Sequence, residues 1–122
     1  MNSYAYQAYK NTQVATASPG ALILMLFDGA IKFSNQAVKC IEQSDFAGAN
    51  EKLLRSQDIM SELISSLNMD VGEISNNLYQ LYSFVCQLLI QANVEKDAKV
   101  INQAVGLLRE LRDMWREVVE NA

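Results

Sequence analysis

Apolar residues recur in steps of three and four along four stretches of this chain, and this spacing is the sequence feature that most constrains the fold. An α-helix places such positions on one face, whereas a strand needs alternation in steps of two, which no segment shows. Helix breakers are also scarce, since the 122 residues include one proline and five glycines. The spacing therefore predicts an all-α protein built from long amphipathic helices.

Polar and turn-forming residues separate the four stretches. Ser18 is a suitable N-cap and Pro19 suits the first helical position of the first helix. Asp45 and Asp97 are suitable N-caps for the second and fourth helices, and residues 68–72 contain the break before the third. These signals predict four helices of about 20 to 25 residues, or about 30 to 37 Å each.

Short connections between helices of similar length make neighbouring helices antiparallel. We therefore expect an antiparallel up-and-down four-helix bundle over residues 18–122, preceded by a short N-terminal arm or helix at residues 1–17. A helical hairpin that dimerises into a bundle is the structural alternative. The inward positions expected from the spacing are Ile23, Leu26, Ala30, Phe33, Ala37 and Cys40 or Ile41; Phe46, Ala49, Leu53, Gln57, Met60, Ile64 and Leu67; Ile74, Leu78, Leu81, Tyr82, Val85, Leu88, Leu89 and Ala92; and Val100 or Ile101, Ala104, Leu108, Leu111, Trp115 and Val118.

The first helix opens with seven consecutive apolar residues, 21–27, which is more than one inward stripe can use. The surplus can pack against lateral neighbours, mediate self-association, or receive an amphipathic helix of another protein. The surplus residues of the four helices are Leu22, Leu24, Met25 and Phe27; Leu54, Ile59 and Leu63; Tyr79, Phe84 and Ile90; and Val105, Leu107 and Met114.

Charge argues against two classes of partner. The formal net charge is −4 and no basic cluster exceeds two residues, so neither nucleic acid nor an anionic membrane surface is expected to bind. The apolar runs are far shorter than the roughly 20 residues of a membrane span, so stable membrane insertion is not expected. The N-terminal stretch MNSYAYQAYKN has no apolar signal core, and we expect a cytoplasmic protein.

The residue types present support little catalytic chemistry. Histidine is absent, which excludes a Ser-His-Asp triad and the Glu-x-x-His di-iron motif. Cys40 and Cys86 fit no zinc or redox spacing and are expected to be small buried apolar residues. Arg109 with Asp113, and Arg116 with Glu120, have the i,i+4 spacing of a solvated helix face. We expect no catalytic residues, metal or cofactor; an enzyme using carboxylates and tyrosines is an alternative without a supporting motif.

Two stretches resemble a known family. TASPGALILMLFDGAIKF is similar to the start of the first helix of the flagellin-specific export chaperones, the FliS family, and NLYQLYSFVCQLLIQANVEKD is similar to a later segment of that family. The resemblance covers nearly the whole chain in the same order and spacing. The matching residues are Tyr9, Val14, Thr16, Ala17, Ser18, Pro19, Leu22, Met25, Leu26, Phe27, Asp28, Gly29, Ala30, Leu78, Leu81, Tyr82, Ala92, Asn93, Asp97 and Trp115.

This resemblance implies a chaperone that binds the disordered C-terminal segment of flagellin in hydrophobic grooves. It further implies that binding stops premature filament assembly and keeps the subunit ready for the flagellar type III export gate. The arm would occupy a groove in the free chaperone, and Tyr9 matches an arm position implicated in docking on the export gate. The groove residues expected here are Leu22, Met25, Leu26, Phe27, Leu78 and Tyr82, and the arm residues are Tyr6, Tyr9 and Val14.

Two other functions fit the same pattern of surplus apolar residues. One is a homo-oligomeric helical adaptor, and the other is a chaperone for a different exported protein. A homodimer of the flagellin chaperone in the absence of client is also compatible with this pattern, because self-association would cover the surplus apolar faces.

Overall fold

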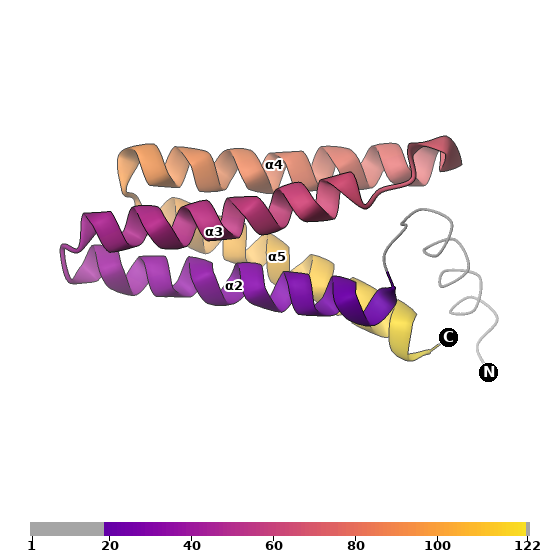
Figure 1. Ribbon diagram of the computed structural model, residues 1–122, viewed down its shortest axis with the longest axis horizontal. Helices are drawn as coiled ribbons and strands as arrows, with labels where there is room; N and C mark the ends of the chain where they lie inside the picture. Colours follow the sequence, from indigo (N-terminus) through magenta and orange to yellow (C-terminus); the bar gives the residue numbers. More distant parts are fainter. Residues whose placement is uncertain (1–18, 122) are drawn as a thin grey trace.

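The structure is a computed structural model that describes residues 19–121, which form four long helices and one short 3₁₀ helix (Figure 1). The four-helix bundle expected from the spacing is confirmed, with no strand among the described residues. The elements are α2 (Gly20–Glu42), α3 (Phe46–Ser65), η1 (Met69–Val71), α4 (Glu73–Glu95) and α5 (Ala98–Glu120).

Two of the expected caps are present. The Asp45 side chain accepts a hydrogen bond of 2.9 Å from the backbone N–H of Gly48, and the Asp97 side chain accepts one of 2.9 Å from that of Lys99. Each bond satisfies a backbone donor that lacks a partner in the first turn of a helix. The boundaries at the starts of α3 and α5 therefore follow from local sequence.

The start of α2 differs by one residue from the expectation. Pro19 was expected at the first helical position, but the helix begins at Gly20 and Pro19 is the N-cap residue, with an extended ψ of 146°. The Pro19 carbonyl already accepts the first helical bond, from the Ile23 N–H at 3.2 Å. The expected cap Ser18, like the arm at residues 1–17, lies outside the described residues.

The break between α3 and α4 is a compact turn. The Asn68 side chain accepts a hydrogen bond of 3.1 Å from the Asp70 N–H, and Ser75 donates one of 2.6 Å to the Asn68 carbonyl. Gly72 follows with a φ of +94°, in the region that side-chain-bearing residues rarely adopt. The turn thus ends α3 and redirects the chain into α4.

Each long helix packs against two others. α3 and α4 contact the helices before and after them in the sequence, and α2 and α5, the first and last described helices, contact each other. α2 lies beside α3 and α5, and α4 lies beside α3 and α5, so the four helices form a closed square. In the view of Figure 1, α5 runs behind α2 and α3. The buried apolar residues make one core cluster along its axis: Ile23, Phe27, Ala30, Ile31, Ala37, Leu53, Met60, Leu63, Leu78, Tyr82, Val85, Leu89, Ala92, Val100, Ile101, Ala104, Val105, Leu108, Leu111 and Trp115.

An aromatic cluster joins three helices in this core. The Trp115 indole N–H donates a hydrogen bond of 2.9 Å to the Tyr82 hydroxyl, and the Phe27 ring meets Tyr82 edge-to-face with centroids 5.8 Å apart. Aromatic rings favour this geometry, and the hydrogen bond satisfies two buried polar groups. Burial raises the pKa of Tyr82, and the bond from Trp115 offsets part of that rise.

Two buried serines link α2 to α3. The Ser56 hydroxyl donates to the Ala30 carbonyl at 3.1 Å and lies 2.9 Å from the Ser34 hydroxyl, which can therefore donate to it. Small residues at this crossing let the two helices approach closely, and the hydrogen bonds offset the cost of burying hydroxyls. The spacing of apolar residues did not predict either serine as inward.

Three residues expected to be inward are exposed instead. Phe46 is 50% exposed, Leu81 is 45% exposed and Ile74 is 38% exposed. Phe46 is the first residue of α3, at an end of the bundle, while Ile74 and Leu81 lie on a flank of α4. Conversely, Phe27, which was counted as surplus, is fully buried. Apolar character permits burial, but only a neighbouring helix at that position provides it.

One described helix, α2, is long and apolar enough to cross a membrane by length and composition alone. The core helix of a soluble protein passes the same test. The side chains that α2 buries are part of the bundle core, among them Ile23, Phe27 and Ala30.

Candidate functional site

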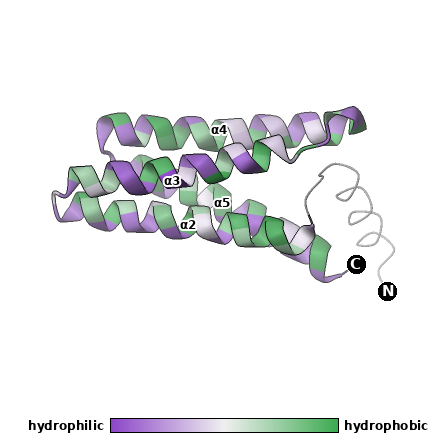
Figure 2. Ribbon diagram, in the orientation of Figure 1, coloured by the Kyte–Doolittle hydropathy of each residue, from purple (hydrophilic) through white to green (hydrophobic). Residues whose placement is uncertain are grey.

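Apolar side chains are exposed on both flanks of α4. Figure 2 shows apolar segments repeated along the whole of this helix. Tyr79, Phe84 and Ile90 are each about half exposed, although a helix packed on one core needs only one apolar stripe. Apolar residues on several sides of a surface helix mark a candidate interaction site.

A hydrogen bond shows which flank of α4 faces α3. The Asn93 side-chain amide donates to the Asn50 side-chain oxygen on α3 at 2.8 Å. Cys86 and Tyr79 precede Asn93 by steps of seven, so they lie on the same flank of α4. The opposite flank of α4 therefore lies toward α5. It includes Leu81 and the residues seven positions before and after it, Ile74 and Leu88.

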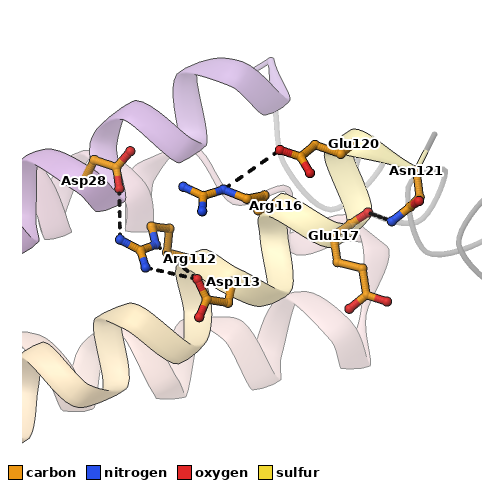
Figure 3. A network of polar contacts seen from close by, with 7 residues as sticks. All are labelled: Asp28, Arg112, Asp113, Arg116, Glu117, Glu120 and Asn121. Atoms are coloured by element: carbon orange, nitrogen blue, oxygen red, sulfur yellow. Dashed lines mark hydrogen bonds and ion pairs between the residues drawn. The ribbon is translucent and has the colours of Figure 1, made fainter.

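The ion pairs drawn in Figure 3 likewise show which flank of α5 faces α2. An Arg112 guanidinium nitrogen is 3.4 Å from an Asp28 carboxylate oxygen on α2, so this flank of α5 faces α2. Leu107 and Met114, seven residues apart, lie on the other flank, toward α4. The two flanks that meet between α4 and α5 are thus both apolar.

Two expected ion pairs on α5 have different outcomes. Arg116 and Glu120 are paired at 4.0 Å, as their spacing predicts. Asp113, which was expected to pair with Arg109, is 3.1 Å from Arg112 instead (Figure 3). Arg112 therefore contacts Asp113 on its own helix as well as Asp28 on α2.

We call the first exposed surface the α4–α5 strip. Leu81, Phe84 and Met114 are each 43–50% exposed, and Ile74 is 38% exposed. The half-buried residues of the strip pack on the core beneath them. The α4–α5 strip consists of Ile74, Leu81, Phe84 and Leu88 from α4 and Leu107 and Met114 from α5.

We call the second exposed surface the α3–α4 strip. It consists of Leu54 from α3 and Tyr79, Cys86 and Ile90 from α4. Leu54, Tyr79 and Ile90 are about half exposed, while Cys86 is a half-buried free thiol. Burial raises the pKa of this thiol, so it is protonated at neutral pH and behaves as a small apolar group.

The six groove residues expected from the family resemblance do not share one surface. Leu22 is 43% exposed and Met25 is 69% exposed on α2, and Leu26 is partly buried beside them. The other three are Phe27, Leu78 and Tyr82. They point toward the bundle axis and pack in the core against neighbouring helices. Their role in client binding stays a prediction, as does that of Tyr6, Tyr9 and Val14, which lie outside the described residues.

The strips contain residues that the site prediction left out. Phe84 and Met114 belong to the surplus apolar set, and Leu81 was taken as inward. The excess of apolar residues was therefore the signal that could have found them. Choosing among those residues required knowing where α3 and α5 stop covering α4.

The described residues hold no candidate metal site. Between residues 19 and 121, no group of three or more His, Cys, Asp or Glu side chains is placed to bind a metal ion.

Sequence comparisons place this bundle among known proteins. The sequence model of the family described as "Flagellar protein FliS" matches residues 1–122, the whole chain. The chain belongs to the FliS family. Among its FliS relatives, the "Flagellar secretion chaperone FliS" of Bacillus subtilis (strain 168) is 34% identical over 116 residues, which cover 95% of this chain and 86% of the relative.

Other FliS proteins give similar values. The "Flagellar secretion chaperone FliS" of Salmonella typhimurium is 35% identical over 124 residues, covering 100% of this chain and 91% of that protein. The protein of the same name from Campylobacter jejuni is 35% identical over 121 residues, covering 98% and 94%. The FliS resemblance inferred from the two motif stretches is thereby confirmed for the whole chain.

Proposed function

We propose that this FliS-family chain is a cytoplasmic, non-enzymatic chaperone for flagellin. It binds the disordered C-terminal segment of flagellin along the two apolar strips beside α4, prevents premature polymerisation, and aids delivery to the flagellar type III export apparatus. The observation that carries the proposal is the exposure of apolar side chains on both flanks of α4. The names of the relatives, which are flagellar secretion chaperones, support it.

The strips suit a disordered client for a physical reason. A disordered segment loses conformational entropy when it binds, so it needs a large apolar contact to bind tightly. A helical client segment satisfies its own backbone hydrogen bonds and needs only side-chain contacts from the chaperone. Leu81 and Met114 on one strip, and Leu54 and Ile90 on the other, offer such contacts on a folded bundle.

Calorimetry with the last 40 or so residues of flagellin from the same organism tests the proposal. We expect saturable binding with a large negative heat-capacity change, because apolar surface is buried. Leu81→Ser and Met114→Ser should each weaken binding severalfold. Met25→Ser is the matched control, because Met25 is also exposed but lies on α2, away from α4.

Each result of this titration has a clear meaning. Weakening by Met25→Ser alone would place the client on α2, as the family resemblance suggested, and would contradict the strip assignment. Absence of binding by the intact, folded chain would contradict the chaperone proposal itself. Client binding should also protect the Cys86 thiol from alkylation, which gives an independent readout on the α3–α4 strip.

We also propose that the arm at residues 1–17 covers an apolar surface in the free chaperone and contacts the export gate after release. Tyr6, Tyr9 and Val14 are the residues we assign to these contacts. A chain lacking residues 1–15 should bind the flagellin segment more tightly than the intact chain. Equal affinity and equal surface hydrophobicity of the two chains would contradict a covering role.

Self-association is the second candidate function, and the same exposed strips favour it. A homo-oligomeric adaptor, or a homodimer that forms without client, would cover these side chains with a second copy. Light scattering over a hundredfold range of concentration separates the alternatives. A mass that rises with concentration in a chain that binds no flagellin segment would favour the adaptor.

A further inference from the structure

Carboxylates border the α4–α5 strip. Glu110 and Glu117 are exposed on α5, each three residues after a strip residue, Leu107 or Met114, and therefore lie next to them on the outer side. Glu73 and Glu95 are the first and last residues of α4 and are also exposed. The strip is thus an apolar surface with negative charge along α5 and at both ends of α4.

Nearby cations leave most of this charge unbalanced. Arg112 and Arg116 lie on the flank of α5 that faces α2, and they pair with Asp28, Asp113 and Glu120. Neither Glu110 nor Glu117 forms an ion pair within residues 19–121. Two exposed cations of α5 lie outside these pairs: Lys99, in its first turn and close in sequence to Glu95, and Arg109, which precedes Glu110 in sequence.

The α3–α4 strip has a different border. Its neighbours are mostly uncharged polar residues, with Asn50 and Ser61 on α3 and Ser83 and Gln87 on α4. Two carboxylates lie beside it, Asp58 four residues after Leu54 and Glu51 three residues before it, and Glu51 is paired with Arg55 at 3.1 Å. The two flanks of α4 therefore present similar apolar side chains with different charge.

We propose that the α4–α5 strip selects an amphipathic client helix whose apolar face is bordered by lysine or arginine. This inference rests on the proposed chaperone function and specifies the client segment that one of its strips accepts. Long basic side chains lay their aliphatic parts on apolar surface while their charges reach the bordering carboxylates. A helix bordered by Asp or Glu would meet like charges at the same positions, which lowers its affinity.

The expected preference is modest because the carboxylates are exposed. One exposed ion pair changes affinity by about twofold to fivefold, so several pairs together give roughly a tenfold preference. Added salt should reduce the preference, because exposed charges are screened. The apolar contacts, which supply most of the affinity, should change little with salt.

Two synthetic helices of 18 residues test the proposal with the full chain. Both carry the same leucine face, and its borders are all lysine in one peptide and all glutamate in the other. We expect the lysine peptide to bind about tenfold more tightly at 50 mM NaCl and the difference to shrink at 500 mM. Fluorescence anisotropy of labelled peptides measures both affinities.

A matched pair of variants separates the strip from the net charge of −4, which attracts any basic peptide. The double variant Glu110→Gln plus Glu117→Gln removes two bordering carboxylates. The control, Glu42→Gln plus Glu62→Gln, removes the same charge from exposed positions of α2 and α3. We expect the first to lose most of the preference and the control to keep it.

Equal affinity for the two peptides would overturn the inference, as would an equal loss of preference in both double variants. Either result together with tight binding of the flagellin segment would leave the proposed chaperone function intact. Failure of the flagellin segment to bind would instead overturn the proposed function. The peptide titrations therefore test the charge preference of the strip, and the flagellin titration tests the chaperone function, independently of each other.

Discussion

At the scale of single residues, Tyr82 links two other helices to α4 through its hydroxyl and its ring. It accepts the indole hydrogen bond of Trp115 at 2.9 Å, and its ring packs against Phe27 from another helix. The three side chains come from α4, α5 and α2, so one small cluster holds three helices in position. Buried polar contacts of this kind add directional constraint to an otherwise apolar core.

Trp115→Phe tests this contact. The phenyl ring fills part of the indole site but cannot donate to the Tyr82 hydroxyl, which is then buried without its partner. We expect the free energy of unfolding to fall by about 2–4 kcal/mol, from the lost hydrogen bond and the smaller ring together. Urea unfolding followed by circular dichroism measures the change.

A companion variant separates the two causes. Tyr82→Phe plus Trp115→Phe should cost less than the sum of the two single changes, because the second change removes a group already left unpaired. Additive losses would show that the hydrogen bond contributes nothing beyond packing.

Tyr82 also predicts a dependence of stability on pH. Burial raises its pKa in the folded chain above the value of about 10 of an unfolded tyrosine. The contribution of Tyr82 to stability is therefore complete below pH 10 and is lost as the pH rises above 10, because only the unfolded chain then ionises. The unfolding midpoint should fall more steeply above pH 10 in the parent chain than in Tyr82→Phe, and parallel curves would contradict this assignment.

At the scale of elements, α4 combines a buried side with two exposed apolar flanks. Leu78 is 6% exposed and Leu81, less than one turn later, is 45% exposed. The same residue type thus has a structural role at one position and is available for binding at the other. Stability and the proposed client binding are therefore expected to change independently on this helix.

Two leucine variants measure that separation. Leu78→Ala should lower the free energy of unfolding by about 2–5 kcal/mol, because it leaves a cavity in the core. Leu81→Ala should lower it by about 1 kcal/mol or less while weakening binding of the flagellin segment. Equal losses of stability would mean that the α4–α5 strip is part of the core in solution.

Two glycines give a second comparison between elements. A Cβ added at Gly106, in the middle of α5, or at Gly72, at the start of α4, would meet nothing within 4 Å. Gly72 has a φ of +94°, so Gly72→Ala should destabilise the chain by about 1–3 kcal/mol through backbone strain. Gly106→Ala should stabilise it by about 1 kcal/mol, because alanine favours the helix.

Thermal unfolding of the two alanine variants decides this comparison. The melting temperature should rise for Gly106→Ala and fall for Gly72→Ala. A fall for Gly106→Ala would show that the exposed face of α5 is covered by another copy or by the arm.

The elements were predictable from the sequence to the extent that their signals are local. Asp45 and Asp97 mark helix starts because a cap acts within three residues, and Gly72 marks a turn because its backbone needs it. Burial was less predictable because it depends on distant neighbours. Ser34 and Ser56 are buried because two helices cross there, which residue type does not indicate.

The sequence predicted an excess of apolar surface at the candidate site but did not predict which residues form it. The excess of apolar residues indicated that some would be exposed. Whether a given one, such as Phe27 or Phe84, lies inward depends on the rotation of its helix about the helix axis. Only the packed neighbours determine that rotation.

At the scale of the whole molecule, the contact between α2 and α5 joins the two ends of the described chain. Buried residues of both helices share the core cluster, and the Asp28–Arg112 pair adds an ionic contact at 3.4 Å. The Arg112 side chain is 23% exposed, whereas that of Asp28 is 52% exposed. The apolar contacts are therefore expected to contribute more than the ion pair.

Arg112→Ala checks that ranking. We expect it to lower the free energy of unfolding by about 1 kcal/mol or less, because a partly exposed pair is solvated in the unfolded chain and screened by salt. Arg109→Ala, at an exposed position of the same helix, controls for the loss of an arginine side chain. A loss above 3 kcal/mol, seen for Arg112→Ala only, would assign the pair a dominant role in closing the bundle.

The closed square of helices also has a consequence for the order in which the chain acquires its surfaces during synthesis. α3 packs against α2 and α4, which adjoin it in sequence, so these contacts form over short chain separations and are expected to form early. The contacts of α5 with α2 and α4 can form only after residues 98–120 have left the ribosome. A nascent chain would therefore present the α3–α4 strip first, and the carboxylate-bordered α4–α5 strip would come into existence only with the last helix.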